Sequence, residues 1–310
     1  MAYTVTDLIA NIKRRSSMPT SQNLFTNDTF ASLATDELLS YVVPMIVSVQ
    51  EEYFTSYKDY TIDPATNRYL IPWDAVGNGL RSVLLVGNQE ESALALRTLS
   101  RLDLEKIASG WLGPVERLTG YYVLGNVVKL YPATQGTSIL RCYYTKRCHE
   151  LVPNVQCFKV REIDTTNKVL TGFSTVPGTM IPGVLVDAIQ ESSSFENHLE
   201  GATILDVPTT TTITLDSVDG VEVNDWISLQ GQSCVVQLPV EAQAVLAQAT
   251  AVKCLEALGD DAGMTRAQNK LQDLITHLSL VMSPRISGAP KRITTAGHGI
   301  FDSTVGQGRR

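Results

Sequence analysis

Apolar residues near the start of the chain recur with helical spacing. One set shares a face and predicts a short N-terminal helix: Val5, Leu8, Ile9 and Ile12. After a polar stretch, the residues Thr35 to Glu37 have the composition of a helix start and predict a longer helix, TDELLSYVVPMIVSVQEEYF. Pro44 removes one backbone N–H inside that helix, so we expect a kink near Ser40.

From about Tyr60 to Leu238 the pattern changes to short β-type runs separated by Gly, Pro, Asn and Asp. Helical spacing survives there only near Leu104 to Ser109. The clearest unit is a hairpin, in which Tyr121–Leu124 and Val127–Tyr131 flank Gly125-Asn126, a pair suited to a two-residue turn. Further strands are predicted at Leu80–Val86, Ile139–Tyr144, Phe158–Ile163, Val184–Asp187, Thr212–Leu215 and Trp226–Leu229.

Helical spacing returns after Pro239. The pattern predicts one helix ending at Gly259 and a second, through Leu271 to Val281, ending at Pro284; the short linker GDDAGM makes them a hairpin. The first helix is rich in alanine, and small side chains allow close approach on more than one side. We therefore expect it to contact adjoining subunits through Ala244, Ala247, Ala251 and Leu255.

The last residues, 284–310, differ from the rest of the chain. They hold five glycines and only scattered apolar residues, a composition that does not build a core. Five basic residues against one acidic residue give this segment a net charge of +4, which leaves −11 for residues 1–283 out of a total of −7. A cationic arm on an acidic body suggests docking to an acidic partner. Fully extended, it would reach roughly 90 Å.

These patterns predict an α+β protein with N-terminal helices, a β-rich middle domain, a C-terminal antiparallel helix hairpin and an extended C-terminal arm. The corresponding boundaries are 1–59, 60–238, 239–283 and 284–310.

Composition narrows the class of protein. The chain is 44% hydrophobic without an apolar run of about 18 residues, so we expect no membrane span, and the polar N-terminus does not read as a secretory signal. Five cysteines without a CxxC pair fit reduced thiols in the cytoplasm. The acidic body is not expected to grip nucleic acid, which leaves passing contact with DNA.

Catalytic and metal-binding motifs are absent from the sequence. The set Cys142, Cys148, His149 and Cys157 lacks the close ligand pair of a zinc site, so we expect no metal. No GxSxG, GxxxxGK[ST] or strand-to-helix GxGxxG motif occurs, and we expect neither an enzyme nor a cofactor. An enzyme stays as the weakest alternative.

Aromatic residues in the middle domain leave one further alternative open. They could line a surface that stacks on sugars, although such residues are more often core or interface residues. They are Trp73, Trp111, Trp226, Tyr121, Tyr122, Tyr143 and Tyr144.

Four segments, taken in order, resemble tailed-bacteriophage head-to-tail connector (adaptor) proteins: TDELLSYVVPMIVSVQEEYF, YLIPWDAVGNGLRSV, LPVEAQAVLAQATAVKCLEALGD and SPRISGAPKR. The resemblance covers Thr35 to Val83 and Leu238 to Lys291, while the middle matches in general character only. It implies a homo-oligomeric ring of about twelve copies in the virion neck, assembled in the host cytoplasm, that continues the DNA channel from the portal toward the tail.

In that family a C-terminal arm commonly docks on the portal protein, and residues 284–310 would do so here. We expect the arm to bind through Pro284, Arg285, Ile286, Lys291, Arg292, Ile293, Phe301, Arg309 and Arg310. The partners implied are further copies of the chain, the portal protein and a tail or nozzle protein. The alternative function is another tail or baseplate subunit, whose β domain binds a neighbouring protein or a host glycan.

Overall fold

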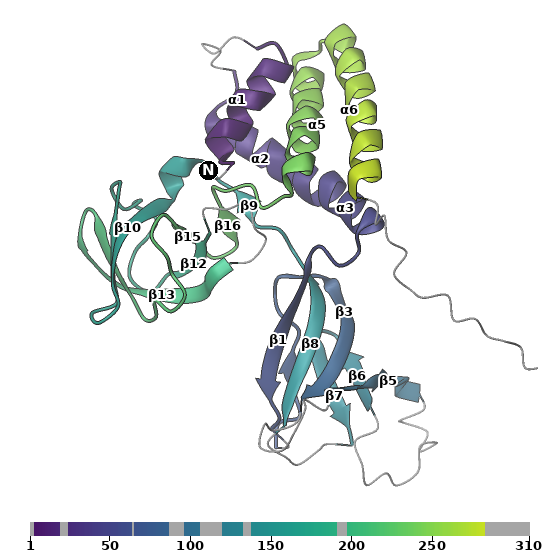
Figure 1. Ribbon diagram of the computed structural model, residues 1–310, viewed down its shortest axis with the longest axis vertical. Helices are drawn as coiled ribbons and strands as arrows, with labels where there is room; N and C mark the ends of the chain where they lie inside the picture. The colour runs from purple at the N-terminus through teal and green to yellow at the C-terminus, as the bar shows by residue number, and fades with distance from the viewer. Residues whose placement is uncertain are drawn as a thin grey trace, which may run out of the picture.

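The computed structural model describes residues 3–18, 24–63, 65–86, 96–105, 120–132, 138–190 and 197–282 (Figure 1). The predicted α+β class is confirmed: along the chain, helices precede and follow a β-rich middle region. The predicted arm, 284–310, lies outside the described residues, as does most of the predicted helical stretch Leu104–Ser109.

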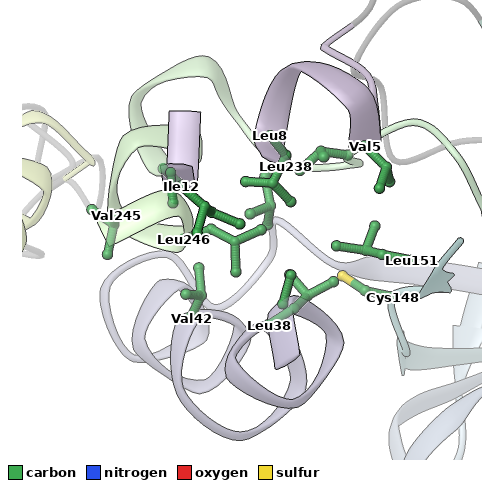
Figure 2. Packing of buried hydrophobic residues seen from close by; sticks show 14 of the residues in the cluster. Val5, Leu8, Ile12, Leu38, Val42, Cys148, Leu151, Leu238, Val245 and Leu246 are labelled. Atoms are coloured by element: carbon green, nitrogen blue, oxygen red, sulfur yellow. The ribbon is translucent and has the colours of Figure 1, made fainter. Parts of the chain in front are cut away.

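A helical body brings the two ends of the chain together (Figure 1). Its elements are α1 (Val5–Arg15), α2 (Asn27–Glu37), the π-helical η1 (Leu38–Val42), α3 (Val43–Val49), α5 (Val240–Leu258) and α6 (Asp261–Met282). Figure 2 shows side chains from these elements meeting in one core, including Leu8 of α1, Val42 of η1 and Leu246 of α5. All three are fully buried, and burying a side chain of this size contributes about 1.5–3 kcal/mol.

The first helix forms as predicted. Val5, Leu8, Ile9 and Ile12 are its buried residues. Thr4 caps it: the backbone N–H of Asp7 donates to the Thr4 hydroxyl, and the backbone N–H of Thr4 donates to the Asp7 carboxylate at 3.0 Å.

The predicted start of the second helix at Thr35 is wrong. The helix begins at Asn27, where Thr26 is the N-cap and accepts from the backbone N–H of Thr29. Thr35 lies inside it: its hydroxyl donates to the carbonyl of Ala31 and accepts from the backbone N–H of Leu151. The Thr35 hydroxyl therefore makes one hydrogen bond within the helix and one tertiary hydrogen bond, and it does not cap a helix.

Pro44 disturbs the helix where the sequence indicated. The five residues Leu38–Val42 form a π turn immediately before it, in which the N–H of Val43 bonds to the carbonyl of Leu38. A proline cannot donate to the carbonyl four residues earlier, and a single wide turn absorbs the missing bond.

The C-terminal hairpin is present. Gly259, with φ of +72°, ends α5 in the left-handed conformation that favours glycine. The linker is shorter than predicted, because α6 already begins at Asp261.

The first β module follows the N-terminal helices. Its strands are β1 (Thr55–Thr61), β2 (Tyr69–Leu70), β3 (Ala75–Val86), β4 (Leu96–Thr98), β5 (Ser100–Arg101), β6 (Gly120–Leu124), β7 (Val127–Tyr131) and β8 (Ile139–Lys146). They form two four-stranded sheets, β1-β8-β3-β4 and β2-β7-β6-β5, around a core that includes Val83, Leu130 and Leu140. The predicted hairpin is confirmed, with Leu124 opposite Val127 and a positive φ at Gly125.

The second β module is a closed barrel in the order β10-β11-β14-β13-β12-β15. Its strands are β10 (Phe158–Asp164), β11 (Val169–Gly172), β12 (Leu185–Ile189), β13 (Asn197–Thr209), β14 (Thr212–Leu215) and β15 (Trp226–Leu229). Phe158, Leu170 and Ile213 are among its fully buried core residues.

A short parallel pair, β9 (Glu150–Leu151) and β16 (Gln232–Ser233), and the 3-10 turn η2 (Asn154–Gln156) lie between the barrel and the helical body. The sequence indicated one β-rich domain over 60–238. In the structure its strands surround two separate cores, one for each β module.

One helical segment, Asn27–Val49, is long and apolar enough by length and composition to cross a membrane. In the structure its buried residues, including Phe30, Leu38 and Ile46, pack in the core of the helical body. Its apolar face thus has a place inside this fold.

Candidate partner-binding surface

The two sets of interface residues predicted from the sequence fare differently. The arm residues Pro284, Arg285, Ile286, Lys291, Arg292, Ile293, Phe301, Arg309 and Arg310 lie outside the described residues. The alanine-rich helix is described, and its surroundings can be examined directly.

Helix α5 is enclosed by its own chain. It contacts α1, α2, η1 and α6, and its buried residues cover every side of the helix: Ala242, Gln243, Val245, Leu246, Ala247, Gln248, Ala249, Thr250, Ala251, Val252, Cys254 and Leu255. Of the predicted inter-subunit residues, Ala247, Ala251 and Leu255 are thus buried within one copy, and Ala244 alone is partly exposed. Small side chains serve here to let four helical elements approach α5 closely.

An apolar groove lies where the helical body meets the first β module. It encloses about 710 Å³ and is referred to below as the α3–β3 groove. Its lining comes from η1 and α3, from β3, and from the end of β8 with the residues after it: Leu39, Val43, Pro44, Val47, Ser48, Val76, Gly79, Leu80, Arg81, Thr145, Arg147 and Cys148. A concave, mostly apolar surface with few polar groups is typical of a binding site.

Two guanidinium groups lie in the lining of this groove. Arg81 is held in place: it forms an ion pair with the Glu51 carboxylate at 2.9 Å and donates to the Thr55 hydroxyl at 2.7 Å. Arg147 is exposed, and no carboxylate of the described residues forms an ion pair with it. The groove therefore offers apolar contact together with one cation still available to an acidic group.

Beside the groove, polar groups, most of them buried, join the three parts of the molecule. Lys146, at the end of β8, pairs with Glu200 of β13. Asn197 donates to Glu200 at 3.3 Å and lies 3.4 Å from Nε2 of His149, and it accepts from the Gln237 side chain at 2.8 Å. We call this set, together with Asp187, the junction network.

Asp187 anchors the junction network in the barrel. Its two carboxylate oxygens accept from the backbone N–H groups of Gly201 at 2.8 Å and Gly231 at 2.9 Å. The Trp73 ring lies against Gly231, where a Cβ atom would come within 3.0 Å of it. Because the Gly231 carbonyl also accepts from the N–H of Glu150, this turn contacts the first β module, the barrel and the segment leading to the helical body.

Burial shifts the pKa values in the junction network. Desolvation, helped by the positive charge of Lys146, lowers the pKa of His149 to about 4, so its ring is neutral at pH 7. Desolvation also raises the pKa of Asp187 and of Asp74, which accepts from the Tyr144 hydroxyl at 3.2 Å. Hydrogen bonds and ion pairs in such a network require defined distances and angles, so they favour one relative orientation of the parts they join.

The cysteines and His149 do not converge. Cys142 lies in the core of the first β module, Cys148 in that of the helical body, and Cys157 in a small cluster with Cys234. Burial raises the pKa of Cys142 to about 12 and that of Cys148 further, so both thiols are protonated. Across the described ranges, no group of three His, Cys, Asp or Glu residues is placed to hold a metal ion.

One histidine–carboxylate pair has the geometry of an oriented base. Nδ1 of His198 lies 2.6 Å from the Asp225 carboxylate, which also accepts from the N–H of Glu222. Within the part of the chain that the structure describes, no hydroxyl or thiol is hydrogen-bonded to the other ring nitrogen. The pair ties β13 to the start of β15, and Gly220 packs against the His198 carbonyl.

The aromatic residues considered for glycan stacking do not share one surface. Tyr121 and Tyr144 are in the core of the first β module, and Trp226 packs against the small cysteine cluster. Trp73 is 60% exposed but lies on the Gly231 turn. Trp111 lies outside the described residues.

No protein family matches the chain, and no curated protein is similar to it. The assignment of a function therefore depends on the sequence and the geometry described above.

Proposed function

We propose that this chain is a structural subunit of a ring that connects the portal vertex of a phage head to the tail and continues the DNA channel. The observation that carries the proposal is the convergence of the two chain ends. Two of the four segments that resemble connector proteins, the one from the end of α2 through α3 and the one that contains α5, pack in one core (Figure 2). Regions far apart in the sequence thus form a single body that carries the β modules as insertions.

Charge supports a channel role. Residues 1–283 have a formal net charge of −11, and an acidic wall repels the phosphates of passing DNA instead of holding them. Contact with DNA is then transient. The subunit would be assembled in the host cytoplasm and reside in the neck of the virion, as a structural component and not as an enzyme.

Helix α6 replaces α5 as the surface proposed to meet neighbouring copies. Only Ala267 and Leu278 of α6 are buried, whereas α5 is enclosed. Its last turn exposes two apolar side chains, Leu280 at 65% and Val281 at 54%. They stand next to Met282, from which the proposed portal-binding arm starts, so ring contacts and the arm would share one end of the helical body.

The test is the mass of the native assembly, alone and with portal rings. We expect a ring in the presence of the portal, and we expect a chain ending at Ser283 to remain folded but to lose co-sedimentation with portal rings. A chain that is monomeric under all conditions, or a truncated chain that still co-sediments, would contradict the proposal.

A second candidate is a tail or baseplate subunit whose β domain binds a neighbouring protein or a host glycan. The observation that favours it is the barrel surface, where Phe173, Ile181 and Leu205 are each more than half exposed. Binding of the full chain to a glycan array, lost on Phe173→Ala, would favour this candidate over the connector.

A further inference from the structure

The α3–β3 groove is an apolar concavity to which the proposed ring assigns no occupant. Leu39 and Val47 from the helical side and Leu80 from β3 are only partly buried, and Val76 is 41% exposed. Burying apolar surface away from water is favourable by roughly 25 cal/mol for each Å². A segment that covers these side chains is therefore stabilised in proportion to the apolar area that it buries.

We propose that residues 300–305 of the same chain, Ile300 to Val305, occupy this groove and hold the C-terminal arm against the body until a partner takes it. The inference rests on the proposed function in one respect only, the identity of that partner. Occupation of the groove itself concerns the chain alone and can be measured without a portal.

The sequence of this segment fits the chemistry of the groove. Ile300 and Phe301 supply adjacent apolar side chains, and Asp302 supplies a carboxylate for the guanidinium of Arg147, which forms no ion pair with the carboxylates of the described residues. The basic pairs Lys291-Arg292 and Arg309-Arg310 lie several residues away on either side, so they need not enter a groove that already contains two arginines. Asp302 is the single acidic residue after Pro284, which makes it the one match to Arg147 that the arm offers.

The starting point of the arm also fits. Helix α6 ends at Met282, whose side chain packs on the core of the helical body. The last helices are close to the groove, because α6 contacts α3 and α3 lines the groove. A connection of about 18 residues has a root-mean-square span of about 24 Å when it behaves as a random coil, so no stretching is required.

Tethering makes weak contact sufficient. A segment on a flexible connection of this length has an effective concentration near 1 mM. If the free peptide bound with a Kd of about 0.1 mM, the attached segment would fill the groove about 90% of the time. A portal ring that binds several arms together could still displace it.

The experiment uses a labelled peptide, residues 296–307, and two forms of the chain. The form ending at Met282 retains every residue of the described core clusters and is expected to fold. We expect it to bind the peptide with a Kd of about 0.1 mM, and the full chain to bind roughly tenfold more weakly because its own segment competes. Equal binding by the two forms, or no binding to either, would overturn the proposal.

Charge reversal locates the contact. Arg147→Glu in the shortened chain should weaken peptide binding about fivefold, as expected for one partly exposed ion pair, and a peptide with Asp302→Lys should recover the loss. The matched control is Arg161→Glu, an exposed arginine on β10 that should leave the affinity unchanged. An Arg147→Glu variant that binds like the Arg161→Glu control would place the peptide elsewhere.

Concentration separates the same chain from a second copy. Competition within one molecule is independent of protein concentration, whereas a segment from a neighbouring copy would compete more strongly as the full chain is concentrated. Concentration-dependent competition would overturn the assignment to the same chain. Failure of the chain to attach to portal rings would leave these results unaffected and would count against the connector alone.

Discussion

The helical body and the barrel solve the same packing problem in opposite ways. The barrel is built from one contiguous stretch, Phe158 to Leu229, and each of its strands pairs with two neighbours, so it leaves no open edge. The helical body needs both ends of the chain, since Leu8 of α1 and Leu246 of α5 share one core (Figure 2). The barrel is thus a self-contained insertion, and the helical body is the part that depends on the whole chain.

The junction network shows how two such different units are held together. Each unit has an apolar core, and polar groups of the junction network link the barrel to its neighbours: Gln237, just before α5, donates to Asn197 at 2.8 Å, and Lys146 of the first β module pairs with Glu200. Polar contacts demand defined distances and angles, whereas apolar surfaces slide with little cost. The network therefore helps to define how the barrel is oriented relative to the first β module and to the segment that leads into α5.

The largest effect is expected from matched core truncations. Leu246→Ala and Ile213→Ala each remove a fully buried side chain, one from the helical body and one from the barrel. Each should lower the free energy of unfolding of its own unit by about 3 kcal/mol, from lost burial and the cavity left behind. Hydrogen exchange followed by region is the suitable measurement, because a multi-unit chain need not unfold in one step.

If the two units are independent, each variant should lower hydrogen-exchange protection only in its own unit. Leu246→Ala should weaken protection in α1, α2 and α5 while the barrel strands keep theirs, and Ile213→Ala should do the reverse. Equal loss of protection in both units from either variant would show that they fold as one.

The junction network should make stability depend on pH. The pKa of His149 is lowered to about 4 in the folded protein from 6.5 in the unfolded chain, because burial disfavours the charged ring. Below pH 6.5 the unfolded chain therefore takes up a proton that the folded protein does not. The contribution of this residue is complete above pH 6.5 and is lost as the pH falls toward 4, by about 3 kcal/mol in total.

Asp187 and Asp74 act in the opposite direction at the acidic end, since their raised pKa values let the folded protein bind protons first. Comparison with a His149→Gln variant cancels the contribution of the two aspartates, because both proteins contain them. Urea titrations between pH 7 and 4.5 should show a flatter pH dependence in the variant by about 2–3 kcal/mol. Parallel curves would exclude His149 as the responsible group.

The sequence was informative where local patterns decide the structure. The face of α1, the Gly125-Asn126 hairpin turn and the left-handed Gly259 all follow from residues close in sequence, and each is present as predicted. Strands such as Thr212–Leu215 and Trp226–Leu229 have the predicted bounds. Alternation of apolar and polar residues and the placement of turn residues are local signals, so the elements that they predict depend little on tertiary contacts.

Features that depend on residues distant in the sequence could not be predicted from it. Thr35 looked like a helix start because its partner, the N–H of Leu151, belongs to another region. The alanines of α5 suggested a neighbouring subunit because nothing in their spacing shows that α1, α2 and α6 of the same chain enclose them. The α3–β3 groove and the junction network are each formed by segments from several parts of the chain. No local sequence pattern predicts either of them.

The smallest effect is expected from a single methyl group in the barrel wall. A Cβ atom at Gly172 would lie 2.1 Å from the Phe158 ring, which is fully buried and has no room to turn away. Gly172→Ala should therefore cost about 1–3 kcal/mol, seen as faster exchange in β10 and β11 alone. Gly178→Ala is the matched control, because nothing lies within 4 Å of a Cβ atom there, and it should change stability by less than about 0.5 kcal/mol. If Gly172→Ala also raised exchange in the helical body, overpacking would travel through the junction network, and the barrel could no longer be regarded as self-contained.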